Sequence, residues 1–316
     1  MDFALAALGL VILVLAGDVL VRGAVNVSLR LGVPALIVSL TIVAIGTSAP
    51  ELLIAIDAVM NDAPGIAIGN VVGSNTANVL LVLGVPALLA GLGAADRETR
   101  DSYLQMLAGT GLFAGIALMA PITWVHGLIL LALYAVFMGR AITSGRRHRR
   151  AEAAAQADLQ DMADADPGMP WWKIALYLVI GLIGLPLGAD ILVDSATTIA
   201  RRFDVSDTVI GLTLVAVGTS LPELATTIAA AFRRQAAVAF GNVIGSNMAN
   251  ILAIIGLAAF FDDIPVAPEI MRFDLWVMVA SALLLAPFVF GRLKLTRIWG
   301  AMFTALYVGY VILVLV

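Results

Sequence analysis

Two short stretches of this sequence place a carboxylate beside hydroxyl groups, and they are nearly identical. Residues 46–52 read Gly-Thr-Ser-Ala-Pro-Glu-Leu, and residues 218–224 read Gly-Thr-Ser-Leu-Pro-Glu-Leu. Each places a glutamate, Glu51 or Glu223, directly after a proline inside a long apolar run. Proline removes one backbone N–H and disturbs the carbonyl group one turn back. We therefore expect each stretch to break a helix and to present carbonyl and hydroxyl oxygens beside a carboxylate.

A second pair of stretches adds serine and asparagine side chains. Residues 69–75 read Gly-Asn-Val-Val-Gly-Ser-Asn, residues 241–247 read Gly-Asn-Val-Ile-Gly-Ser-Asn, and a further asparagine follows each by three residues. Side chains three residues apart share one face of a helix. We expect this face to contribute hydroxyl and amide oxygens next to the glutamates. The candidate side chains are Ser74, Asn78, Ser246 and Asn250.

The oxygen-rich character of these stretches indicates a site for a hard cation. Ca²⁺ takes about six to eight oxygen ligands in irregular geometry. The chain has no cysteine and its two histidines lie outside the motifs, which argues against zinc or copper. A charge buried in lipid costs roughly 2.5–3.5 kcal/mol, so each acid needs a partner, a proton or a cation. Two plainer interpretations stay open. The glutamates could be protonated and purely structural, and the motif glycines could serve only close packing of helices.

The elements that carry these residues are predicted to be membrane helices. Of 316 residues, 61% are hydrophobic and 13% are charged, which excludes a soluble enzyme, a disulfide scaffold and a disordered chain. About 20 apolar residues suffice to cross a bilayer. The sequence predicts ten such spans, namely Phe3–Leu31, Val33–Met60, Pro64–Leu92, Tyr103–Pro121, Trp124–Ile142, Trp172–Phe203, Val205–Phe232, Ala236–Phe261, Phe273–Phe290 and Ile298–Val316.

The chain repeats itself with a shift of 172 residues. The shift aligns residues 18–84 with residues 190–256 without a gap and brings both motif pairs into register. Five spans per half is an odd number, so the second half enters the membrane from the opposite face, as in many secondary transporters. We expect an all-α membrane protein with ten transmembrane helices, built as two inverted five-helix repeats with broken helices 2 and 7. The repeats are residues 1–142 and 171–316, joined by a connector at 143–170.

Positive charge predicts the orientation of these spans. When the connections are assigned alternately to the two faces, 15 of the 18 basic residues fall on one side. Basic loops stay in the cytoplasm. We therefore expect a cytoplasmic connector and both termini outside. Arginine far outnumbers lysine, which favours a bacterial source and so a multi-pass protein of the plasma (bacterial inner) membrane.

Other ionisable residues lie inside the predicted spans. Asp18 precedes Arg22 by four residues, so an ion pair within the helix is at least as plausible as a role on a cation path. The 172-residue shift turns Asp18 into Asp190 but turns Arg22 into Asp194, so this pairing is not repeated. Asp57 is interpreted as a residue of the outer mouth.

The paired motifs resemble the two alpha-repeats of the cation/calcium exchanger superfamily, and within it the sodium/calcium exchanger branch, which includes bacterial calcium/sodium antiporters. The resemblance covers nearly the whole chain in span count, inversion and central loop. The cation/proton branch instead carries a Gly-Asn-x-x-Glu type of motif, which this sequence lacks.

The resemblance implies a cluster of cation sites between the two broken helix pairs. A central calcium site would use the carboxylates of Glu51 and Glu223 with the backbone carbonyls of Thr47 and Thr219. Sodium sites on either side would draw on Ala44, Ser48, Ser74, Ala216, Ser220 and Ser246, while Asn78 and Asn250 would line the centre. Members of the branch often carry aspartate at one of these two asparagine positions, in the second repeat. Asparagine at both leaves two carboxylates, which neutralise one Ca²⁺, and leaves the sodium stoichiometry and any role of H⁺ or K⁺ open.

The sequence therefore predicts a secondary active antiporter that exchanges Na⁺ for Ca²⁺ by alternating access. Apart from the transported ions it implies no cofactor, no nucleic acid and no obligate protein partner. An enzyme is disfavoured because no nucleophile–base pair or nucleotide-binding loop is evident. Two alternatives stay open. A Ca²⁺(cation)/H⁺ antiporter requires a glutamate that titrates near neutral pH, and a passive cation channel requires broken helices that line a pore.

Overall fold

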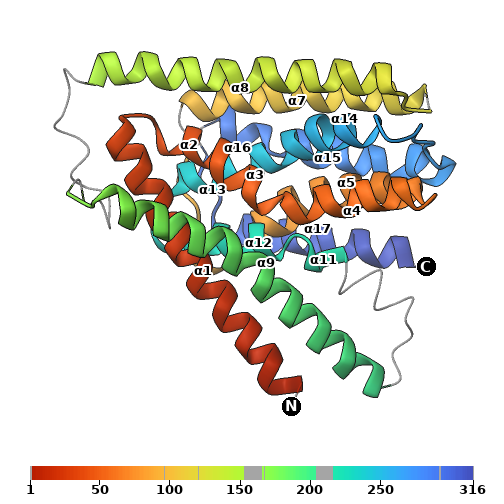
Figure 1. The fold of residues 1–316 in the computed structure, drawn as a ribbon, viewed down its shortest axis with the longest axis horizontal. Helices are drawn as coiled ribbons and strands as arrows, with labels where there is room; N and C mark the ends of the chain where they lie inside the picture. Colours follow the sequence, from red (N-terminus) through yellow and green to blue (C-terminus); the bar gives the residue numbers. More distant parts are fainter. Residues whose placement is uncertain are drawn as a thin grey trace.

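The chain folds into a bundle of helices (Figure 1). A computed structural model describes residues 2–95, 97–119, 121–152, 166, 168–203, 216–291 and 293–315. Over these residues no strand occurs, and two isolated bridges, Leu92 with Leu295 and Ile122 with Ile264, join loops. The predicted all-α class is confirmed. In the 143–170 connector, residues 143–152 continue helix α8, while 153–165 and 167 lie outside the described residues, as do 205–215 at the beginning of the seventh predicted span.

The elements follow the apolar runs of the sequence. In the first half they are α1 (Asp2–Leu31), α2 (Ala35–Val38), the π-helical turn η1 (Ser39–Val43), α3 (Ala44–Thr47), α4 (Ala49–Met60), α5 (Pro64–Ala77), η2 (Asn78–Val82), α6 (Gly84–Ala90), α7 (Arg97–Leu118) and α8 (Trp124–Glu152). In the second half they are α9 (Trp171–Arg202), α11 (Ala216–Gly218), α12 (Leu221–Phe232), α13 (Ala236–Met248), η5 (Ala249–Ile254), α14 (Ile255–Ala258), η6 (Ile270–Asp274), α15 (Leu275–Leu284), α16 (Ala286–Phe290) and α17 (Arg297–Leu315).

Eight of the ten predicted spans are long and apolar enough to cross a membrane, when one bent pair is counted as a single span. The fourth predicted span forms helix α7, but polar residues in its first turns lower its hydropathy. The seventh is described only from Ala216 onward and contributes the short apolar helix α12. The count of ten spans and their inversion therefore stay predictions.

The first predicted helix break lies at Ser48. There the backbone leaves helical geometry (φ −84°, ψ 9°), Pro50 opens the next helix, and the two arms meet at 44°. At the matching position Ser220 has φ −89° and ψ 3°, and Pro222 opens α12. The π-helical turns η2 and η5 follow the two Gly-Ser-Asn stretches. Such turns are rare and occur often at functional sites.

The helices that carry the Gly-Ser-Asn stretches form the centre of the bundle. In the spans Pro64–Ala90 and Ala236–Ala258, 78% and 94% of the most apolar segment is buried, against 17–39% in the other long spans. The motif side chains are thus surrounded by protein, while the outer helices present their apolar faces outward.

Helices α1 and α9 pack along each other and project from the bundle (Figure 1), and residues of α2, η1 and α12 complete their apolar core. They cross at Gly9 and Gly188, where an added Cβ on either residue would lie about 3 Å from the other residue's carbonyl oxygen (2.9 and 3.0 Å). Gly181 and Gly184 continue the contact against Leu20 and Ala16. Small residues allow such close approach between membrane helices. The pair can therefore be treated as one body.

Candidate functional site

The two repeated glutamates occupy matching positions in the structure. Glu51 is the third residue of α4 and Glu223 the third residue of α12, each directly after a helix break, and each is 1% exposed. The positive end of a helix dipole stabilises a carboxylate in the first turn. The two carboxylates are also close enough to interact electrostatically. The fold thus brings two acids of like charge together inside the protein.

Glu223 is held by hydroxyl groups from both halves of the chain. The Ser48 hydroxyl donates to Glu223 Oε1 at 3.2 Å, and the Ser246 hydroxyl donates to the same oxygen at 3.4 Å. Ser48 belongs to the first helix break and Ser246 to α13. Two predicted sodium ligands are therefore adjacent to a predicted calcium ligand.

Asn242, which the sequence analysis did not select, connects the two helix breaks. Its Nδ2 donates to the Glu223 carbonyl oxygen at 3.3 Å and to Thr227 Oγ1 at 3.2 Å. Its Oδ1 accepts from the Thr47 hydroxyl at 3.4 Å. The sequence did contain a signal for Asn242, because the dipeptide Gly-Asn occurs at the same place in both motif copies, at Asn70 and at Asn242.

Four buried asparagines bind one another across the two copies of the motif. Asn75 Nδ2 donates to the Asn247 carbonyl oxygen at 3.1 Å, and Asn247 Nδ2 donates to the Asn75 carbonyl oxygen at 3.4 Å. Asn78 Nδ2 donates to Asn247 Oδ1 and Asn250 Nδ2 to Asn75 Oδ1, each at 3.0 Å. The pattern is reciprocal between residues that the 172-residue shift equates. Only Asn78 and Asn250 of these four were candidate site residues.

This network orients the amide groups of Asn78 and Asn250. Because their Nδ2 atoms donate to oxygens, their Oδ1 atoms face elsewhere, and both are buried without a hydrogen-bond partner. Burying a polar atom without a partner is costly and uncommon. Each of the two amides therefore has a donor end that is held by a hydrogen bond and an acceptor end that is available to a ligand.

Six such unpartnered buried oxygens belong to the candidate residues. They comprise two carboxylate, two hydroxyl and two amide oxygens, on the elements packed around the glutamates: Glu51 Oε2, Glu223 Oε2, Ser74 Oγ, Ser220 Oγ, Asn78 Oδ1 and Asn250 Oδ1. This donor set suits a hard cation such as Ca²⁺ or Na⁺. No group of three or more His, Cys, Asp and Glu residues that could hold a metal ion occurs in the described part of the chain.

The remaining candidates lie on the same helix breaks. Ala44 is buried in α3 and Thr47 is buried at its end. Ala216 is the first residue of α11, and its side chain is outside the described set. Thr219 is half-buried and lines a cavity of about 160 Å³ that also contacts Asp190 and Asp194 of α9. The second break thus adjoins a cavity lined by two acids.

Two motif glycines are required by close packing. An added Cβ on Gly241 would lie 2.8 Å from the Leu36 carbonyl oxygen, and one on Gly245 would lie 2.6 Å from the Leu40 carbonyl oxygen. These contacts press α13 against α2 and η1 and so hold Ser246 beside the first break. For Gly69 and Gly73 no such contact occurs within 4 Å among the described residues. The packing interpretation therefore has support in the second copy.

Comparison with known proteins agrees with the motif analysis. Residues 1–143 and 173–316 match the sodium/calcium exchanger protein family. The chain is 34% identical to the sodium/calcium exchanger MaX1 of Methanosarcina acetivorans, over 98% of this chain and 97% of that protein. It is 32% identical to the inner membrane protein YrbG of Escherichia coli, over 90% and 87%. A solved structure of the sodium-calcium exchanger NCX_Mj, soaked without Na⁺ and Ca²⁺, matches with a TM-score of 0.82 and 34% identity, over 97% and 96%.

Proposed function

The chain belongs to the sodium/calcium exchanger protein family, and we propose that it is a secondary antiporter that exchanges Na⁺ for Ca²⁺ across a membrane by alternating access. Full-length similarity to proteins named as sodium/calcium exchangers supports this function. The observation that carries it is the buried pair Glu51 and Glu223, surrounded by hydroxyl and amide oxygens that lack partners.

The charge of the site explains coupling between the two ions. Two carboxylates balance the charge of one Ca²⁺ or of two Na⁺. Because the site can balance only one of these loads at a time, Ca²⁺ and Na⁺ compete for the same oxygens. A site without a cation would leave two like charges buried, at a cost of several kcal/mol per ion. Reorientation without cargo is therefore unfavourable, and the gradient of one ion drives the other.

The candidate residues divide into three groups by role in this proposal. The carboxylates of Glu51 and Glu223, with the carbonyls of Thr47 and Thr219, would bind Ca²⁺. Asn78 and Asn250 would line the centre with their free Oδ1 atoms. The flanking sodium ligands would be the four serine hydroxyls and two alanine carbonyls, namely Ser48, Ser74, Ser220, Ser246, Ala44 and Ala216. Support comes from the contacts of Ser48 and Ser246 with Glu223.

The proposed architecture is ten spans in two inverted repeats, residues 1–142 and 171–316, with 143–170 as a cytoplasmic connector. The reciprocal asparagine bonds between equivalent residues support a two-fold relation of the halves. The distribution of basic residues supports external termini in a plasma (bacterial inner) membrane. No obligate protein partner is part of this proposal.

The test is ⁴⁵Ca²⁺ uptake into proteoliposomes that contain the purified chain. An outward Na⁺ gradient should drive uptake against a Ca²⁺ gradient, and this uphill uptake should cease when Na⁺ is equal on both sides. Uptake driven by a proton gradient in the absence of Na⁺ would instead identify a Ca²⁺(cation)/H⁺ antiporter. Flux that follows only the Ca²⁺ gradient would identify a channel.

A further inference from the structure

Three basic side chains from separate segments line one cavity, which we call the basic cavity. Arg234 follows helix α12, Lys294 lies in the loop between α16 and α17, and Arg297 is the first residue of α17. The cavity has a volume of about 440 Å³, and the turn after α6 forms another part of its wall. A hollow lined by charges of one sign concentrates the electrostatic potential. The basic cavity is therefore a candidate site for an anion.

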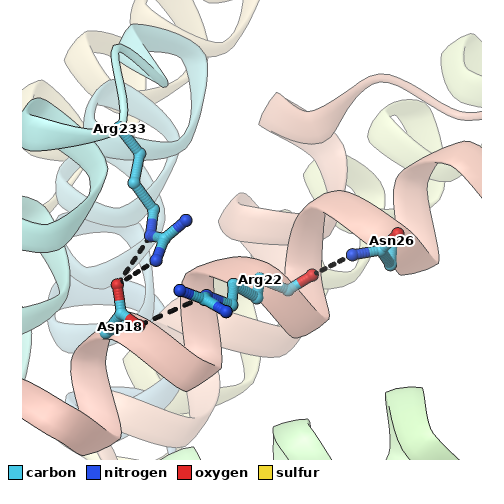
Figure 2. Close-up of polar contacts among 4 residues, drawn as sticks. All are labelled: Asp18, Arg22, Asn26 and Arg233. Atoms are coloured by element: carbon cyan, nitrogen blue, oxygen red, sulfur yellow. Dashed lines mark hydrogen bonds and ion pairs between the residues drawn. The ribbon is translucent and has the colours of Figure 1, made fainter. Parts of the chain in front are cut away.

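The two consecutive arginines after α12 have different partners. Arg233 Nε donates to Asp18 Oδ1 at 2.7 Å, and the same carboxylate also pairs with Arg22 (Figure 2). In the part of the chain that the structure describes, no carboxylate pairs with Arg234 or with the other two cations of the basic cavity, and no acidic residue lines it. Like charges that lack a counter-charge repel one another. The basic cavity therefore favours a negatively charged occupant.

The beginning of α17 adds to the positive potential. The first backbone N–H groups of a helix have no partner within the helix, and the helix dipole places partial positive charge at this end. An acidic residue in the first turn can compensate this charge. Helix α17 has no acidic residue there and begins with Arg297, and both Thr296 and Arg297 line the basic cavity. This helix end therefore favours an anion that the chain itself does not supply.

Backbone hydrogen bonds hold the walls of the basic cavity in place. The Leu92 N–H donates to the Leu295 carbonyl oxygen at 2.9 Å, which joins the loop after α6 to the loop before α17. Arg234 has a φ of 58°, in the left-handed region that is uncommon for residues other than glycine. Glycine is the usual residue at such a position after a helix. The turn itself does not require an arginine, so the Arg234 side chain needs a separate explanation.

The other half of the chain has the same backbone frame without these charges. The 172-residue shift equates Arg234 with Asp62, which has nearly the same φ, 57°. The second isolated bridge lies two residues before α8, just as the first lies two residues before α17. Helix α8 begins with Trp124, whereas α17 begins with Arg297. The frame therefore does not depend on cations, and only one of its two copies carries them.

Exposed apolar side chains adjoin the basic cavity. Phe232 lies two residues before Arg234 and is 64% exposed, and Leu293 and Ile298, next to the other two cations, are 47% and 81% exposed. Apolar surface is stabilised when it is removed from water, so these side chains favour contact with acyl chains. Basic pockets between membrane helices bind the headgroups of anionic lipids. Charge and apolar surface together favour a phosphate that carries acyl chains over a soluble phosphate.

We propose that Arg234, Lys294 and Arg297, with the first N–H groups of α17, bind the phosphate of an anionic phospholipid. The bound phosphate would connect the end of α12 to the beginning of α17. This site is separate from the candidate cation site at Glu51 and Glu223. It requires that the chain lies in a membrane, but it does not require Na⁺/Ca²⁺ exchange.

The test measures lipid binding to the purified full-length protein in detergent, by native mass spectrometry during titration with phosphatidylglycerol. One basic residue near the membrane surface strengthens binding of anionic lipid by roughly five-fold. Arg234→Gln, Lys294→Gln and Arg297→Gln should each raise the Kd of the first phosphatidylglycerol by about this factor. Lys294→Arg keeps the charge and should bind like wild type. Phosphatidylcholine, whose headgroup has no net charge, should bind more weakly to wild type and should respond little to the three Gln variants.

Two control variants separate the basic cavity from general charge and from folding. Arg140→Gln removes an exposed arginine of α8 and should bind phosphatidylglycerol like wild type. Arg234→Gly removes the cation but suits the left-handed backbone, so it should weaken lipid binding while its thermal unfolding midpoint stays at or above the wild-type value.

Two results would overturn the inference. The first is a wild-type Kd in the three Gln variants, or an equal loss in Arg140→Gln. The second is displacement of phosphatidylglycerol by low millimolar inorganic phosphate, which would assign the basic cavity to a soluble phosphate. Lipid binding requires no transport, so a wild-type protein without Na⁺-driven uptake would contradict only the exchanger function.

Discussion

The two site glutamates are equivalent in the sequence but not in their surroundings. Glu223 Oε1 accepts hydrogen bonds from Ser48 and Ser246. The 172-residue shift equates these serines with Ser220 and Ser74, and Glu223 with Glu51. Both of those hydroxyl oxygens are instead buried without a partner, while the second oxygen, Oε2, of each glutamate is unpartnered alike. The two hydroxyls that bond Glu223 are engaged, and their two equivalents under the repeat are available.

This difference shows that the two copies of a motif carry the same chemical groups, but that in one conformation equivalent groups make different hydrogen bonds. An alternating-access transporter needs two states that exchange the roles of its halves. The asparagine bonds, by contrast, are reciprocal and join the halves at the centre. We therefore expect the carboxylates and asparagines to respond symmetrically to mutation, and the serines to respond asymmetrically.

Removal of either carboxylate charge should have the largest effect. Glu51→Gln and Glu223→Gln should each lower Na⁺-driven ⁴⁵Ca²⁺ uptake by at least about 100-fold, because one remaining charge cannot balance a buried divalent ion. Glu269→Gln, the same substitution at an exposed acid, is the control and should transport normally. If only one of the two site variants lost uptake, the asymmetry would extend to cation binding itself.

Truncation of the central asparagines should destabilise the protein equally from either half. Asn75→Ala and Asn247→Ala each remove one donor (Nδ2) and one acceptor (Oδ1) of the reciprocal network and leave buried groups unpaired, which costs about 1–3 kcal/mol per group. Thermal unfolding of the purified protein in detergent measures the loss. Asn61→Ala, at an exposed asparagine, should change the midpoint little. A large difference between the two buried variants would contradict the two-fold relation at the centre.

Asn250→Asp should make the stability of the centre depend on pH. Asn250 Nδ2 donates to Asn75 Oδ1 at 3.0 Å, and an aspartate can replace that donor only in its protonated form. The folded variant should therefore favour the proton, so its stability should fall as pH rises through the range in which the acid ionises. Unfolding midpoints from acid to alkaline pH, compared with wild type and with Asn250→Ala, measure this. A pH profile parallel to that of wild type would show that the Asn250–Asn75 bond is not formed.

The serines should give the smallest effects and the clearest contrast between the halves. Ser48→Ala removes a donor to Glu223 and should destabilise the cation-free protein by about 1 kcal/mol. Ser220→Ala removes a hydroxyl that has no partner and should leave this stability unchanged, while it lowers the apparent Na⁺ affinity. Unfolding midpoints and Na⁺ titrations of both variants test the contrast. Equal destabilisation by the two substitutions would show that Ser220 is also engaged in the cation-free protein.

The sequence by itself determined most of the helices and indicated the candidate site. Apolar runs of about 20 residues and proline-containing breaks are local patterns, so eight spans and the break at Ser48 could be predicted from them. The motif repeat likewise selected Glu51 and Glu223 because buried acids are costly enough to stand out in an apolar chain. Family matches over nearly the whole chain confirm the predicted membership.

Only the tertiary structure decided how these residues pair. Asn75 and Asn247 are 172 positions apart, and Asp18 and Arg233 are 215 apart, so no local spacing indicates either contact. The sequence suggested Arg22 as the partner of Asp18, and the fold added Arg233 because close packing at Gly17 lays α1 on α12. Tertiary packing also decides that the Ser48 hydroxyl bonds Glu223 while the equivalent Ser220 hydroxyl has no partner. Repeated residues have equal bonding capacity, and the packing of one asymmetric conformation determines which of them is used.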